Sequence, residues 1–119
     1  MDDSETQNYI RIQLRKAGQS NRRIRFNVFR WGLQFDGAIV SHKGNPVLVW
    51  NFLGKSGHRS DKKHKAELVK RGIKEFEIPL LNQWKMKLAV IELVDYVQYR
   101  RSRGKSLKVY QNVEIMRAR

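Results

Sequence analysis

Three acidic side chains are the best candidates for catalytic chemistry in this sequence. Glu75 and Glu77 stand two residues apart in the segment IKEFEI, so on a β-strand they would share one face. Together with Asp36, such a pair could bind Mg²⁺ and support a metal-dependent nuclease. The same glutamates could simply pair with the nearby Lys74 or Arg71, and no third acid is close in the sequence. We therefore expect no enzyme and no catalytic residue, with the nuclease as the least favoured alternative.

The histidines do not form a recognisable metal site. His58 and His64 are six residues apart in a basic segment with no third ligand nearby, and cationic neighbours disfavour a dication. His42 stands alone in an expected turn. The count of zero cysteines removes thiolate zinc sites, disulfides and cysteine nucleophiles. We expect no metal and no cofactor.

Positive charge dominates the chain. Its 119 residues carry 25 Lys and Arg against 11 Asp and Glu, a formal net charge of +14 at pH 7. This charge gathers at 9–31, 55–74 and 100–108, where carboxylates are too few to pair the cations, so a polyanion is the expected partner. Nucleic acid is favoured over an anionic membrane surface or an acidic protein. The expected RNA-binding residues are Arg11, Arg15, Lys16, Arg22, Arg23, Arg25, Arg30, Lys43, Lys55, Arg59, Lys62, Lys63, Arg100, Arg101, Arg103 and Lys105.

An alternating pattern predicts that residues 9–31 form a β-hairpin. The segments 9–14 (YIRIQL) and 22–31 (RRIRFNVFRW) alternate apolar and polar residues, and the segment between them supplies Gly18 and small polar residues. Side chains alternate faces along a strand, so the hairpin would carry an apolar face and an arginine face. That face would include Arg11, Arg15, Arg23 and Arg25.

The remaining pattern predicts further strands and two helices. Strands are expected at 46–53 and 73–78, and residues 33–40 could be a short strand or a crossing loop. A short helix is expected from Ser60 or Asp61 to Arg71, before Gly72. Residues 81–101 form the best helix, apolar around most of its circumference and therefore expected to pack as core on the sheet. The expected fold is α+β, with a small mixed or antiparallel sheet that begins with a hairpin, one long core helix and one short helix. We expect a disordered acidic tip (1–8), a single RNA-binding domain (9–100) and a basic C-terminal extension (101–119), in which 107–116 could be a strand or a helix.

Aromatic residues interleave with the basic ones. They could stack on bases, as on single-strand-binding surfaces, or form the core of a small sheet. We favour the core for Phe26, Trp50 and Phe52, whereas Phe29 and Trp31 are the candidates for base stacking.

The segment Ile12 to Phe29 (IQLRKAGQSNRRIRFNVF) resembles the opening of the bacterial-type small-subunit ribosomal protein sixteen family. That family opens with an Ile-x-Leu strand, a basic Gly-containing turn, and then an arginine followed by a strand of aromatic and β-branched residues. Residues 41–54 and the Asn82-Gln83-Trp84 start of the long helix are similar over shorter stretches. The family's Arg-Pro is Arg22-Arg23 here, and residues 31–38 have no counterpart of that length.

The resemblance implies a divergent member, mitochondrial rather than bacterial cytoplasmic, that binds ribosomal RNA in the small subunit and supports its assembly. By position, it implies RNA contacts for Arg15, Lys16, Arg22 and Lys43. Ribosomal RNA and neighbouring small-subunit proteins are the expected partners, and we expect neither a membrane partner nor a homo-oligomer. The alternative is a phage or viral protein that binds single-stranded nucleic acid.

Overall fold

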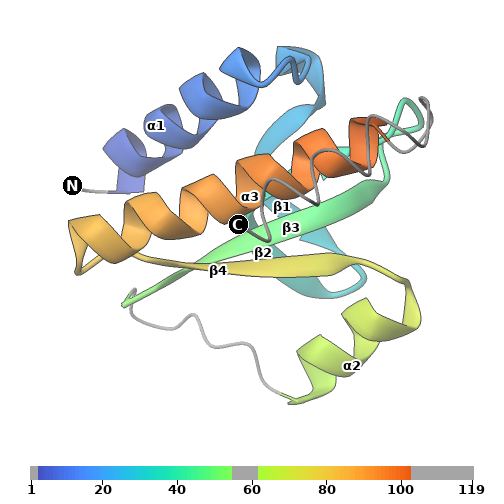
Figure 1. The fold of residues 1–119 in the computed structure, drawn as a ribbon. Coiled ribbons are helices and arrows are strands. Elements are labelled where there is room, and N and C mark those ends of the chain that lie inside the picture. Colours follow the sequence, from blue (N-terminus) through green and yellow to red (C-terminus); the bar gives the residue numbers. More distant parts are fainter. Residues whose placement is uncertain (1–2, 55–61, 103–119) are drawn as a thin grey trace, which may run out of the picture.

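The computed structural model describes residues 3–54 and 62–102 of the chain (Figure 1). In chain order its elements are α1 (Asp3–Lys16), the 3₁₀ turn η1 (Asn21–Arg23), β1 (Ile24–Arg30), β2 (Leu33–Val40), β3 (Pro46–Leu53), α2 (Lys62–Lys70), β4 (Lys74–Pro79) and α3 (Gln83–Ser102). The expected α+β class, with a hairpin, a long helix on the sheet and a short helix, is confirmed. Six of these elements lie close to their expected ranges: β1, β2, β3, β4, α2 and α3.

The four strands form one mixed sheet in the order β1-β2-β3-β4. The pairs β1–β2 and β2–β3 are antiparallel, whereas β3 and β4 are parallel and are connected through α2. Helices α1 and α3 cover one face of the sheet, and α2 lies on the other (Figure 1).

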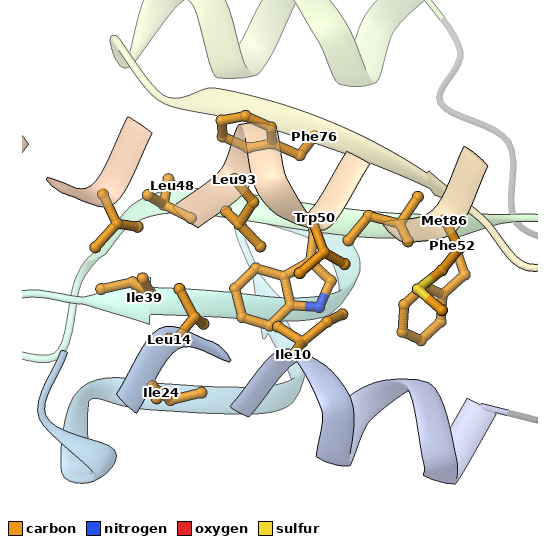
Figure 2. Packing of buried hydrophobic residues seen from close by; sticks show 13 residues of the cluster. Ile10, Leu14, Ile24, Ile39, Leu48, Trp50, Phe52, Phe76, Met86 and Leu93 are labelled. Carbon is orange, nitrogen blue, oxygen red and sulfur yellow. The ribbon is translucent and has the colours of Figure 1, made fainter. Parts of the chain in front are cut away.

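The main core lies between the sheet and the helix pair α1 and α3 (Figure 2). Trp50 and Phe52 of β3 are fully buried there, and Phe26 packs against its edge, so the expected core role of these aromatics is confirmed. A smaller cluster on the α2 face contains Phe35, Val49 and Leu68. The sheet is therefore covered by apolar packing on both faces, although the second layer is thin.

The expected strand at residues 9–14 is wrong, because these residues belong to helix α1. Thr6, Ile10 and Leu14 are buried at a spacing of four residues, which places them on one side of a helix. Acidic residues in the first turn and basic residues in the last turn match the helix dipole. The helix ends in a glycine cap: Gly18 has φ of 91°, and the Gln19 N–H donates to the Leu14 carbonyl at 3.0 Å. Residues 3–8, expected to be disordered, are the start of this helix.

The hairpin of the sheet is formed instead by β1 and β2, joined by a tight turn at Trp31 and Gly32. Both turn residues have positive φ, 54° and 73°, as in two-residue turns that match the twist of a hairpin. Along β1, Phe26 packs against the main core, but Val28 packs against the cluster on the α2 face. The intervening Asn27 has φ of 54°, so the strand changes its inward face at this residue.

Candidate nucleic-acid interface

Four segments that are far apart in the sequence meet at one end of the molecule. The Arg101 guanidinium donates to the Ala17 carbonyl at 3.1 Å, which joins the C-terminal end of α3 to the end of α1. The Arg100 guanidinium donates to the Val47 carbonyl at 3.1 Å, which joins the same end of α3 to β3. We call the group at this place the basic end; it consists of Arg15, Lys16, Arg22, Arg23, Arg25, Lys43, Arg100 and Arg101.

Two surface hollows lie in the basic end. One, of about 260 Å³, is lined by Arg22, Arg23 and Arg25 together with the turn after β2, including Ser41 and His42. The other, of about 280 Å³, lies between this turn and α3 and is lined by Arg23, Arg100 and Arg101. Arg23 lines both, so the two hollows form a continuous surface. Among the described residues, no acidic residue lines either hollow.

Eight of the expected RNA-binding residues therefore converge, but not on a hairpin face. The α1 and α3 ends, η1 and the turn at 41–45 supply most of them, and only Arg25 lies within a strand. Arg15, Arg22 and Arg25 are exposed, whereas Arg23 is half-buried. Cations spread over several rigid elements are spaced to contact several phosphates at once, which is the usual way a protein is positioned on a nucleic acid.

The tip of the β1–β2 hairpin lies beside the basic end. The Arg30 guanidinium donates to the Asn45 side-chain oxygen in the turn that also carries Lys43. The guanidinium of Arg71, which follows α2, lies 4.2 Å from the centre of the Trp31 ring. Phe29 is 71% exposed, so an unstacked aromatic ring lies next to this cationic surface.

Arg11 does not share a face with Arg23 and Arg25, and that expectation is wrong. Its guanidinium carbon lies 4.7 Å from the centre of the Phe26 ring. It lines a groove of about 910 Å³ between α1 and β1, together with the acidic residues Asp3 and Glu5. This groove is of mixed charge, so Arg11 is a packing residue rather than part of the basic end.

Six expected RNA-binding residues cannot be placed as side chains. Lys62 and Lys63 belong to the first turn of α2 by their backbone. The other four lie outside the described residues: Lys55, Arg59, Arg103 and Lys105. The expected strand or helix at 107–116 also lies outside them.

The three acids of the nuclease hypothesis occupy different environments. Asp36 is 1% exposed, and its carboxylate accepts the Phe52 N–H at 2.7 Å. Glu75 and Glu77 share the α2 face of β4, as their spacing predicts. Glu77 lies at the surface, 3.5 Å from the Lys65 ammonium.

Glu75 belongs to a buried polar chain that the sequence analysis missed. Asn51 accepts the Asp36 N–H at 3.0 Å and donates from its amide to the Glu75 carboxylate at 2.8 Å. His64 of α2 lies 3.1 Å from the same carboxylate oxygen. These polar contacts connect β2, β3, β4 and α2, and they therefore fix α2 on the sheet. Asn51 could have been noticed as the only polar residue in the apolar segment PVLVWNFL.

The described residues contain neither a metal-binding group nor a membrane-spanning helix. Within 3–54 and 62–102, no group of three histidines or acids could hold a metal ion. His58 lies outside these ranges, and His42 lines a hollow of the basic end. No helix in the part of the chain that the structure describes is long and apolar enough to cross a membrane.

Comparison of the chain with protein-family models, with curated proteins and with solved structures gave no match. The geometry and charge of the basic end are therefore the guide to its function.

Proposed function

We propose that this chain is a non-catalytic RNA-binding protein that binds the phosphate backbone of RNA through its basic end. The observation that carries the proposal is that five arginines from separate segments line two adjoining hollows that no described acid lines: Arg22, Arg23, Arg25, Arg100 and Arg101. Arg15, Lys16 and Lys43 belong to the helix end and the turn that border these hollows. The cations of such a surface repel one another in the free protein, and bound phosphates reduce this repulsion. The contacts would be mainly to backbone, so the RNA would be recognised largely by its shape.

Within this class, we propose a structural role in a small ribosomal subunit, with ribosomal RNA and neighbouring subunit proteins as partners and a mitochondrial location. This finer proposal is supported by the resemblance at Ile12 to Phe29. The support is limited to the second half of that segment, because its first half, expected as a strand, is helical. Co-sedimentation with small ribosomal subunits in high salt would support the ribosomal role, and release at moderate salt would count against it.

Binding of structured RNA by the basic end can be tested through its salt dependence. If six of the eight cations contact phosphates, log Kd should change with log salt with a slope of roughly 5. The double variant Arg22→Ala/Arg25→Ala should lower that slope by about 2 and weaken binding to all structured RNAs alike. Filter binding or fluorescence anisotropy over a salt series measures both quantities.

A matched control removes the same charge elsewhere. Lys85→Ala/Lys87→Ala also removes two exposed cations, but from the start of α3, the opposite end from Arg100 and Arg101. It should leave the slope within about 0.5 of the unmodified value. Equal losses in both double variants would mean that net charge, and not the basic end, governs binding.

A second candidate function is binding of single-stranded nucleic acid. The 71% exposure of Phe29, next to the Arg71–Trp31 stack, favours it, because aromatic rings at such a surface can stack on unpaired bases. Strong quenching of tryptophan fluorescence by poly-dT would support it. So would a loss of about 1–3 kcal/mol of binding free energy for poly-dT in Phe29→Ala. Tight binding to folded ribosomal RNA with weak binding to poly-dT would exclude it in favour of the first proposal.

A further inference from the structure

Helix α3 exposes a second apolar stripe on the side that faces away from the core. Its buried residues are Met86, Val90, Leu93 and Val97, spaced three or four residues apart on one side of the helix. Trp84, Leu88 and Ile91 follow the same spacing on the opposite side, where they are 72%, 44% and 54% exposed. At 100° per residue these three side chains point about 130–170° away from the centre of the buried stripe.

Such a stripe is unusual for a surface helix. An amphipathic helix on a sheet normally carries charged or polar residues on its outer side. Helix α3 has Glu92 and Asp95 on that side, but it also places these three large apolar residues there in exposed positions. Leu81, just before α3, is also 87% exposed. Clustered exposed apolar residues of this size mark an interaction surface.

We propose that the outer stripe of α3 pairs with the same stripe of a second copy of this chain, with the two helices antiparallel. A twofold axis near residue 88 would place Leu88 against Leu88 of the second copy. It would place Trp84 of each copy against Ile91 of the other. A self-complementary patch related by a twofold axis is the commonest way in which identical chains associate.

The charges beside the stripe are what select a second copy as the occupant. Lys85 and Glu92 lie on the same flank of α3, two turns apart, and both are exposed. In an antiparallel pair, equivalent flanks face each other, so this axis brings Lys85 of each copy to Glu92 of the other. Neither residue has an ion pair inside the ranges that the structure describes. An unrelated partner would have no reason to match this arrangement.

The high net charge does not oppose this pairing strongly. Arg101 lies about 19 Å along the helix axis from the proposed twofold, since α3 rises 1.5 Å per residue. The two basic ends would therefore point in opposite directions, about 38 Å apart along the axis. Charges at that distance are screened at physiological salt, where the Debye length is about 8 Å. The pair departs from the expectation that the chain forms no homo-oligomer, and it leaves both basic ends open.

Sedimentation velocity of the full chain, freed of nucleic acid by nuclease and high salt, tests the proposal. We expect a monomer–dimer equilibrium in the micromolar range, as for a small interface. Leu88→Glu should raise the dissociation constant at least about tenfold, because it places two carboxylates together at the axis. Leu88→Glu also lowers the net charge of each copy. If overall repulsion between the copies governed association, this variant would therefore have a lower dissociation constant, not a higher one.

The charge pairs allow a test of orientation. Lys85→Glu and Glu92→Lys should each weaken their own dimer roughly threefold to tenfold, and an equimolar mixture of the two should form the mixed dimer preferentially. The matched control Lys87→Glu makes the same charge change as Lys85→Glu but on the other flank of α3. It should leave the monomer–dimer equilibrium unchanged. A full chain that stays monomeric at high micromolar concentration, or a dimer unaffected by Leu88→Glu, would overturn the proposal. A mixture without preference would overturn the antiparallel arrangement.

Discussion

Gly37→Ala should destabilise the fold strongly, although the substitution is small and Gly37 does not have a positive φ. Gly37 of β2 pairs with Trp50 of β3. A Cβ at this position would lie 2.0 Å from Cε2, 2.1 Å from Cζ2 and 2.3 Å from Nε1 of the indole. Ordinary contacts are at 3.4–4 Å, so the ring would have to retreat by more than 1 Å. Trp50 has no exposed surface and lies among Ile10, Leu14 and the sheet, so it has no free space to enter (Figure 2).

The magnitude follows from two opposing terms. Overpacking a well-packed core typically costs about 1–3 kcal/mol, and overlap with three ring atoms puts this site at the upper end. The loss of glycine flexibility in the unfolded chain offsets about 0.4–1 kcal/mol. We therefore expect a net loss of about 2–3 kcal/mol in the free energy of unfolding, measured by urea denaturation in high salt without nucleic acid.

A double-mutant cycle identifies the cause. Trp50→Leu alone should be destabilising, because it removes a fully buried ring. Combined with Gly37→Ala, it should recover at least about 1 kcal/mol relative to the sum of the two single variants, since the methyl group then has room. A Gly37→Ala variant within about 0.5 kcal/mol of the unmodified protein, or strictly additive effects, would refute the close-packing argument.

Three further substitutions test other contacts. Asn82→Ala should cost about 1 kcal/mol of unfolding free energy, because the Asn82 side chain caps α3 by accepting a backbone N–H at 3.0 Å; Asn82→Asp, which keeps the acceptor, should cost little. Asn51→Leu should cost about 2–3 kcal/mol by thermal or urea unfolding, because it leaves a buried N–H and the Glu75 carboxylate without their amide partner, and a neutral result would show that this polar chain does not hold α2. Arg71→Ala should cost only about 0.5–1 kcal/mol but change the fluorescence of Trp31, and an unchanged emission spectrum would count against the stack at the hairpin tip.

Most of the sheet could be predicted from the sequence because its strands carry strong local signals. The apolar run that begins at Pro46 and the glycine at Gly72 mark β3 and the end of α2. The error at residues 9–14 has a simple physical origin. Ile10 and Leu14 fit both an alternating strand pattern and a four-residue helical spacing, and only tertiary packing of α1 against α3 decides between them.

The site was predictable by charge but not by geometry. Charge predicts Arg22, Arg25 and Arg100 as residues that would contact a polyanion, and in the structure they lie at one end of the molecule. Sequence alone could not show that the ends of two helices and a turn meet there, because these contacts join residues up to 84 positions apart. The outer stripe of α3 was read as core for a related reason: periodicity shows that a residue is apolar, but not whether anything covers it.

The bond between Arg101 and the Ala17 carbonyl has a consequence for synthesis of the chain. Protein chains emerge from the N-terminus at about 5–20 residues per second, so α1 and the β1–β2 hairpin are exposed before α3 has been made. Until then, Arg22, Arg23 and Arg25 lack the neighbours that complete their surface. If the basic end binds a polyanion as proposed, a partly synthesised chain would bind it weakly, and full affinity would require that α3 has been made.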